Sequence, residues 1–142
     1  MKMLDLTRFI NAHKIKYGDA LQEIREGCKR THWMWYIFPQ IDGLGFSDTA
    51  RFYAIHDLDE AKAFLKDEYL GGNLREITSA LLPHKDASVH DIFGYPDYLK
   101  LQSCMTLFAI ASEEDDSIFR QVLKQFFQGK QDEKTLSLLS AR

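Results

Sequence analysis

The stretch Cys104-Met105-Thr106-Leu107-Phe108-Ala109-Ile110-Ala111 is apolar at every position except the threonine. Pro96 lies shortly before it, and a proline at the first position of a helix loses no hydrogen bond, because the N–H it lacks would be unpaired there. These residues predict a helix over about 96–111. A helix that is apolar on every side has to be buried, so it should be the central helix of the core.

The rest of the chain also carries helical signals on both sides of this segment. Two short helices are predicted before residue 28, the first capped by Asp5 and the second ended by Gly27, because apolar residues recur there at helical spacing. Later helix starts are indicated at Ser47, Asp57, Ser88 and near Phe119, a break at Gly71-Gly72, and a last amphipathic piece around Leu136 and Leu139. No alternating strand pattern or internal repeat is present. We predict an all-α fold, one compact domain over residues 1–142 with about seven or eight short helices.

Composition and charge argue against several classes of protein. The 142 residues contain 18 Lys and Arg against 21 Asp and Glu, a formal charge of −3, whereas nonspecific nucleic-acid binding needs a strongly basic surface. The chain has only two cysteines, Cys28 and Cys104, and they form no disulfide framework or zinc ribbon. It also has no signal-peptide pattern and no apolar run that could span a membrane. We therefore expect a cytoplasmic protein with no membrane association; no pattern indicates an oligomeric state.

The most specific segment is Lys29-Arg30-Thr31-His32-Trp33-Met34-Trp35-Tyr36-Ile37-Phe38-Pro39-Gln40, which places both tryptophans beside a histidine and two cations. Its six-residue apolar run, 33–38, suits a buried strand or a buried helix by periodicity alone. A short helix is favoured, because Thr31 can cap its start and Pro39 disfavours helical geometry at the residue before it. The free N–H groups of such a first turn, with Lys29 and Arg30 beside them, would hold a phosphate or carboxylate.

The tryptophans, the histidine and the Lys-Arg pair of this motif each have a structural alternative. Trp33 and Trp35 are two residues apart and point in different directions, so one is expected to pack in the core while the other lines a cavity. His32 is the candidate for proton transfer at a site, and its alternative is a core histidine bonded to backbone. The Lys-Arg pair is equally compatible with a solvated surface.

Other chemistries find little support in the sequence. The histidines do not have the spacing of a zinc-ligand set, and we predict no metal and no cofactor. Gly43-Leu44-Gly45 lacks the third glycine of a dinucleotide-binding turn and is better explained as a backbone bend. Cys28 lies among cations that could lower its pKa, but no orienting partner for a nucleophile can be identified.

A second polar group precedes the central helix. Asp97, Lys100 and Ser103 are spaced by three and follow one edge of the predicted helix. The plain alternative is a surface ion pair between Asp97 and Lys100, which stabilises a helix by only a few tenths of a kcal/mol. We predict that this edge, together with Gln40, lines the other side of the site that the aromatic motif begins.

The motifs resemble a family known as domain of unknown function 1810. The resemblance spans nearly the whole chain, although Tyr98 and Cys104 stand where the family pattern has Asp and commonly Ser. It implies an all-helical, bacterial-type cytoplasmic domain of unassigned activity. The matching blocks are Lys29 to Gln40, Gly43 to Gly45, Ser47 to Ala50, Tyr53 to Ile55, Ile92 to Asp97, Lys100, and Ser103 to Phe108.

Two functional hypotheses follow. In the first, the protein is an enzyme or sensor that binds or hydrolyses a small anionic or nucleotide-like ligand, with an ADP-ribose compound suggested only by analogy with other small helical domains. Its site would combine His32 for proton transfer with ligand contacts from Lys29, Arg30, Thr31, Trp33, Trp35, Gln40, Asp97, Lys100 and Ser103. In the second, the chain is a non-catalytic interaction or structural module whose aromatic motif is core. Convergence of His32, Asp97 and Lys100 on one pocket would favour the first.

Overall fold

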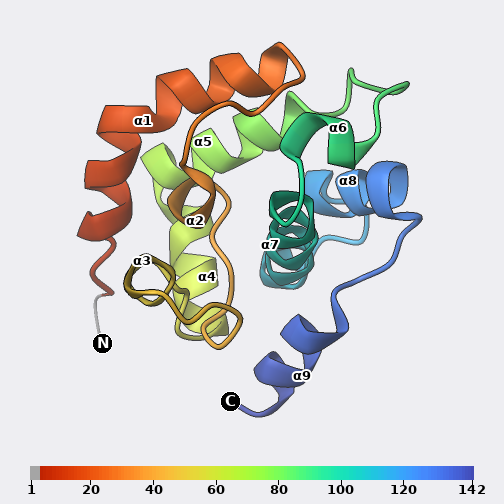
Figure 1. Cartoon of the computed structure of the whole chain (residues 1–142). Coiled ribbons are helices and arrows are strands. Elements are labelled where there is room, and N and C mark those ends of the chain that lie inside the picture. Colours follow the sequence, from red (N-terminus) through yellow and green to blue (C-terminus); the bar gives the residue numbers. More distant parts are fainter. Residues whose placement is uncertain (1–3) are drawn as a thin grey trace.

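A computed structural model describes residues 4–142, which contain nine α-helices and one isolated parallel bridge between Ile41 and Ile55 (Figure 1). The all-helical prediction is confirmed, with nine helices rather than seven or eight. None of the helices in these residues is long and apolar enough to cross a membrane. The helices are α1 (Thr7–Arg25), α2 (Met34–Ile37), α3 (Asp48–Phe52), α4 (Leu58–Lys66), α5 (Glu68–Ser79), α6 (Val89–Phe93), α7 (Asp97–Ser112), α8 (Ile118–Phe127) and α9 (Glu133–Ser140).

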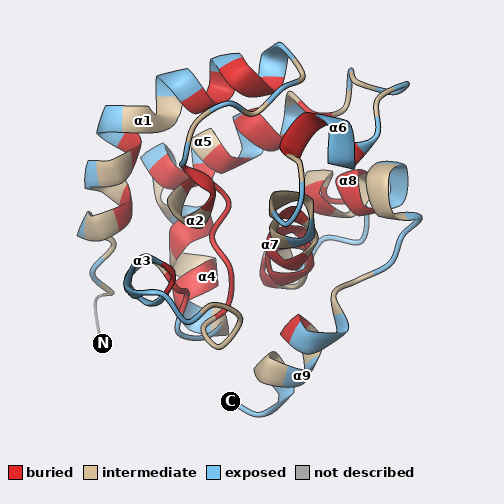
Figure 2. Cartoon of the chain, in the orientation of Figure 1, coloured by how far each residue is buried: buried red, intermediate tan, exposed pale blue. Residues whose placement is uncertain are grey.

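The predicted central helix is α7. It packs against α4, α6, α8 and α9, and it is almost wholly buried from Ser103 to Ala109 (Figure 2). Pro96 is its N-cap rather than its first residue, a shift of one position. The apolar run that predicted a core helix therefore lies at the middle of the molecule, as expected from its lack of a polar face.

The prediction of two short helices before residue 28 is wrong, because α1 is one continuous helix of 19 residues. Gly18 lies within it and has open space where a side chain would project, so it is an exposed helical glycine that costs only about 1 kcal/mol relative to alanine. The buried stripe includes Phe9, His13, Leu21 and Ile24 and runs through both predicted segments. The end near Gly27 is confirmed.

The predicted break at Gly71-Gly72 is also wrong, because α5 runs through both glycines. The chain instead turns at Asp67, which ends α4 and caps α5 by accepting hydrogen bonds from the backbone N–H groups of Tyr69 and Leu70. A Cβ on Gly71 would lie 2.1 Å from the carbonyl oxygen of Leu65. Glycine is present there so that two helices can approach closely, and not to end one of them.

Two contacts place the aromatic motif between α1 and the start of α7. The backbone N–H of Lys29 donates to the carbonyl of Ile92 in α6 at 2.7 Å, just before α7 begins. The buried His13 of α1 lies between α2 and α5, with Nε2 2.9 Å from the carbonyl of Tyr36 and Nδ1 3.1 Å from the amide of Asn73. Residues separated by more than 60 positions in sequence are thereby brought to one side of the fold.

Candidate functional site

The aromatic motif divides into a segment without helical structure and the four-residue helix α2. Trp33, not Thr31, is the N-cap of α2, and no side chain within residues 4–142 caps it. The predicted Thr31 cap is therefore wrong. The Thr31 hydroxyl instead donates to Oε2 of Glu23 at 2.7 Å. A single helical turn has too small a dipole to support an anion site at its start.

Glu23 occupies the position where an external anion was predicted. Its carboxylate accepts hydrogen bonds from the backbone N–H groups of Arg30 and Thr31 at 2.6 and 3.0 Å and from the indole Nε1 of Trp33 at 3.0 Å. The residue is only 7% exposed. Burial alone would raise the pKa of Glu23, but the hydrogen bonds from Thr31, Arg30 and Trp33 lower it to about 2. The backbone donors of this turn are thus taken by the protein's own carboxylate.

Arg30 lies outside the site. Its guanidinium is exposed and forms an ion pair with Glu26, the residue that follows the end of α1. The predicted pairing of Lys29 and Arg30 around one anion is not what the structure shows, because Lys29 pairs with Asp97 and Arg30 with Glu26.

Lys29 and Lys100 converge on one carboxylate. Nζ of Lys29 lies 2.8 Å from Oδ2 of Asp97, and Nζ of Lys100 lies 3.1 Å from Oδ1 of the same residue. The Lys29 side chain is only 7% exposed and also donates to the carbonyl of Thr31 at 2.6 Å. Burial raises the pKa of Asp97, yet the two lysines outweigh it and hold that pKa below its usual range. The three groups together carry a formal charge of +1.

The two tryptophans differ in burial, as predicted, although both line the small cavity described below and only one was expected to. Trp33 is 1% exposed and packs against Phe38 and Phe93 in the core. Trp35 is half-buried, and Nζ of Lys100 lies 4.4 Å from its ring centroid, within the range of a cation–π contact. The prediction that at least one is fully buried is confirmed for Trp33.

A small cavity lies against this group and has a volume of about 110 Å³. It brings together three separate segments: the motif, the start of α3 and the start of α7. Lys100 is not itself in the lining, but it contacts two residues that are, Asp97 and Trp35. The lining residues are Lys29, His32, Trp33, Met34, Trp35, Tyr36, Thr49 and Asp97.

Gly45 lies against Trp35, one of the residues that line the cavity. A Cβ at this position would lie 2.7 Å from the ring of Trp35 and 2.6 Å from Cβ of Ala50. The predicted backbone bend at residues 43–45 therefore allows the loop to lie directly on the Trp35 ring, and it carries the chain to Thr49 on the cavity wall. Thr49 was not anticipated, since one threonine in a helix start carries no distinctive pattern.

His32 and Thr49 are the exposed members of the lining. The backbone carbonyl of His32 accepts a hydrogen bond from the Tyr36 hydroxyl at 3.3 Å. Of the three residues predicted to converge on one pocket, His32 and Asp97 line the cavity, whereas Lys100 reaches it only through its contacts with Asp97 and Trp35. The alternative, a core histidine bonded to backbone, describes His13 instead.

Ser103 and Gln40 do not line the cavity. The Ser103 hydroxyl lies 3.1 Å from Oδ2 of Asp132, the residue that caps α9, so it helps hold α9 against α7. Gln40 is 4% exposed. Its backbone carbonyl accepts a hydrogen bond from the N–H of Ile55, and its side-chain Nε2 has no hydrogen-bond partner among residues 4–142. Within the same residues, no cluster of three or more His, Cys, Asp or Glu side chains could hold a metal.

Comparison with known proteins shows the family to which the chain belongs. The chain belongs to the family described as Protein of unknown function (DUF1810), whose model matches residues 3–139. A crystal structure of the conserved hypothetical protein Rv1873 from Mycobacterium tuberculosis is similar to it, with 43% sequence identity over 96% of each chain and a TM-score of 0.93. A search of curated proteins gave no match.

Proposed function

We propose that this protein binds a small ligand through a phosphate or carboxylate group, in the cavity beside Lys29, Asp97 and Lys100. The observation that carries the proposal is that two lysines share one carboxylate and leave a charge of +1 at a partly enclosed site. Lys29 supports this role because it is largely buried and already fixed by Asp97 and the Thr31 carbonyl. A preorganised cation of this kind loses little side-chain entropy when an anion binds.

Lys100 supplies the available hydrogen-bond donors. An ammonium group has three N–H donors, and among residues 4–142 that of Lys100 has one hydrogen-bond acceptor, Asp97. Its remaining donors can bind an anion oxygen, while the Trp35 ring holds its position through the cation–π contact. The hydroxyl of Thr49 and the imidazole of His32 are further donors from the cavity wall.

The size of the cavity limits the ligand class. A volume of about 110 Å³ is well below the roughly 300–1,000 Å³ of sites that enclose a drug-sized molecule. It accommodates one phosphate or carboxylate group, so the remainder of a nucleotide or ADP-ribose compound would lie outside, across the exposed rim. The proposal is therefore recognition of a terminal anionic group, with His32 placed to donate to that group or to transfer a proton to an oxygen of it.

A thermal-shift screen of the wild-type protein tests this function. Nucleotides, ADP-ribose compounds, phosphorylated metabolites and small carboxylates should include a ligand that raises the melting temperature, because binding to the native state alone stabilises it. His32→Ala and Lys100→Ala should melt close to wild type without ligand and lose the ligand-induced shift. If both variants unfold readily and no compound shifts the wild type, these residues are structural.

The second candidate function is a non-catalytic interaction or structural module. It is favoured by the burial of Trp33, Met34, Ile37 and Phe38, which makes much of the aromatic motif part of the core. Under this alternative the Lys29–Asp97–Lys100 group would join the motif to α7 and nothing more. The same screen separates the two, because a structural ion cluster gives large losses of stability in the variants and no response to any anion.

A further inference from the structure

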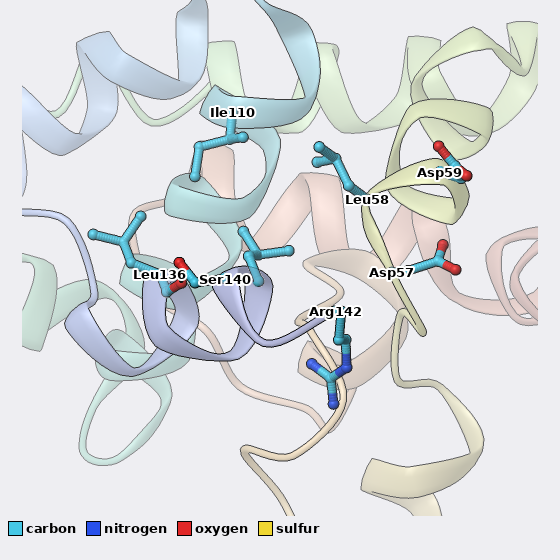
Figure 3. Close-up of a pocket in the computed structure, with 8 residues that line it drawn as sticks. Asp57, Leu58, Asp59, Ile110, Leu136, Ser140 and Arg142 are labelled. Carbon is cyan, nitrogen blue, oxygen red and sulfur yellow. Dashed lines mark hydrogen bonds between the residues drawn. The ribbon is translucent and has the colours of Figure 1, made fainter.

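A larger hollow lies on a different part of the molecule, between the start of α4, the end of α7 and the last helix α9 (Figure 3). Its volume is about 460 Å³, within the range of sites that bind small organic molecules. None of its lining residues belongs to the aromatic motif or to the cavity beside Asp97. It can therefore be considered independently of the proposed function.

The floor of this hollow is aliphatic. Leu58 of α4, Ile110 of α7, and Leu136 and Leu139 of α9 line it, and all four are only half-buried. In Figure 3 the labelled members Leu58, Ile110 and Leu136 approach the hollow from three different helices. Aliphatic groups left partly in water on three converging helices gain free energy when an apolar body covers them, at about 25 cal/mol per Å².

Hydrogen bonds hold the start of α9 against α7. Asp132 receives hydrogen bonds from Ser103 at 3.1 Å through its carboxylate, and its backbone N–H donates to the Thr106 hydroxyl at 2.8 Å. These contacts fix the start of α9 on α7, and Thr135 is the only buried residue of the helix. Leu136 and Leu139 of α9 therefore line the hollow and do not close it.

One side of the hollow is acidic. Asp57 and Asp59, at the start of α4, line it, and only Oδ1 of Asp57 is used as a cap, accepting from the Glu60 N–H at 2.9 Å. The cation of the lining is Arg142, which donates to the carbonyl of Asp42 at 2.9 Å and lies 3.9 Å from the carboxylate of the same residue. Asp57 and Asp59 therefore lie on the α4 side of the aliphatic floor. Neither carboxylate forms an ion pair with a lysine or arginine among residues 4–142.

We infer that this hollow binds a small organic cation with an apolar body, of the alkylamine or arylalkylamine class. The apolar part would cover Leu58, Ile110 and the α9 leucines, and the ammonium would lie by Asp57 and Asp59. The volume favours a small molecule over a folded partner, and the charge on the rim favours a cation over an anion of the same shape. This class is opposite in charge to the ligand proposed for the first site.

Titration of the ¹⁵N-labelled protein with hexylammonium, followed by NMR, tests the inference directly. Hexanoate and 1-hexanol provide the same apolar body with a negative charge and with no charge. Hexylammonium should shift the amide signals around Leu58, Ile110 and Leu139 in a saturable way, and hexanoate should not shift them. Hexanol should bind at least about tenfold more weakly, the value of a charge-assisted contact.

Two variants locate the site. Asp57→Asn with Asp59→Asn removes both charges but keeps a capping oxygen at position 57, so α4 should remain intact, and hexylammonium affinity should fall about tenfold or more. Ser140→Trp places a ring in the hollow from an exposed position of α9 and should abolish binding. Asp91→Asn, an exposed aspartate at the start of α6, is the matched control and should bind like wild type.

Several outcomes would overturn the inference. Equal binding of hexanol and hexylammonium would show that the carboxylates play no part. Shifts that do not saturate, or that lie mainly away from α4, α7 and α9, would show that the hollow is not a site. Unchanged binding in the double aspartate variant, with the fold intact by its amide spectrum, would contradict the assignment of the ammonium position.

Discussion

Two carboxylates lie on either side of the aromatic motif, and they differ in what surrounds them. Glu23 accepts hydrogen bonds from two backbone N–H groups, a hydroxyl and an indole, all within a closed turn. Asp97 is shared by two lysines beside a cavity. The first arrangement leaves a buried negative charge with only neutral donors, and the second leaves an excess positive charge.

Under the proposed function, this difference separates a carboxylate with a structural role from one at a ligand site. Neutral donors that surround a carboxylate have no further capacity for a ligand, so the Glu23 turn is complete without one. A cation that shares its counter-ion retains both charge and donors, as Lys100 does. Proximity of Lys and Arg residues in the sequence does not reveal which of these applies, whereas the identity of their partners does.

We expect the largest difference in the free energy of unfolding between variants of the two tryptophans. Trp33→Ala removes a fully buried ring whose indole also binds Glu23, and we expect a loss of about 3 to 5 kcal/mol in the free energy of unfolding. Trp35→Ala should cost distinctly less, because that ring is half-buried. Urea denaturation of both variants measures the difference, and similar midpoints for the two would contradict the assignment of Trp33 to the core and Trp35 to the cavity.

Removal of the structural carboxylate should have the next largest effect. Glu23→Ala leaves two backbone N–H groups and an indole without an acceptor, at about 1–3 kcal/mol for each donor that water cannot reach, so we expect a loss of roughly 3 kcal/mol. Lys100→Gln, on the other side of the comparison, should lose less than about 1 kcal/mol, because its ion pair is partly exposed. A Glu23→Ala protein as stable as wild type would show that the turn is hydrated.

Acid should weaken the Glu23 turn over a defined pH range. The pKa of Glu23 is about 2 in the folded protein against an ordinary value of 4.5, so between these values the unfolded chain binds more protons than the folded one. Its contribution to stability is complete above about pH 4.5 and is lost as the pH falls toward 2. Urea unfolding at several pH values should show a smaller acid-dependent loss for Glu23→Gln than for wild type. Glu114→Gln, at an exposed position outside the ion pairs of residues 4–142, is the control and should keep the wild-type slope.

A fourth effect concerns the cavity wall. Gly45→Ala places a methyl group 2.7 Å from the Trp35 ring, so either the ring or the loop has to move. We expect a loss of about 1–3 kcal/mol, typical of overpacking, together with a change in tryptophan fluorescence. Gly72→Ala is the matched control because its position is open, and it should be neutral or slightly stabilising. Unchanged fluorescence and stability in Gly45→Ala would mean that the loop does not rest on the ring.

Local patterns in the sequence predicted the fold well and the site only in part. The apolar run in α7 and the caps at Ser47, Asp57 and Ser88 are short-range signals, and the structure confirms them. Gly71 misled because a glycine signals a break only when the backbone needs its freedom, and that depends on contacts distant in sequence.

The site required long-range information. Spacing could place Asp97 and Lys100 on one helix edge, but it could not show that Lys29 reaches them while its neighbour Arg30 turns back to α1. Glu23 was overlooked altogether, although a carboxylate beside Ala20, Leu21 and Ile24 on a buried helix face is a signal of an internal acceptor. Ser103 continues the spacing of Asp97 and Lys100, yet it is turned toward Asp132.

The central claim is that Lys100, and not Arg30, belongs to an anion-binding site. Calorimetric titration with phenyl phosphate, a small phosphate monoester with an apolar body, should show saturable binding to the wild-type protein. Lys100→Gln should weaken it about tenfold or more, and Arg30→Gln, a change of the same charge in the same neighbourhood, should leave it unchanged. Equal weakening by both variants would indicate a general electrostatic attraction with no site, and it would contradict the claim.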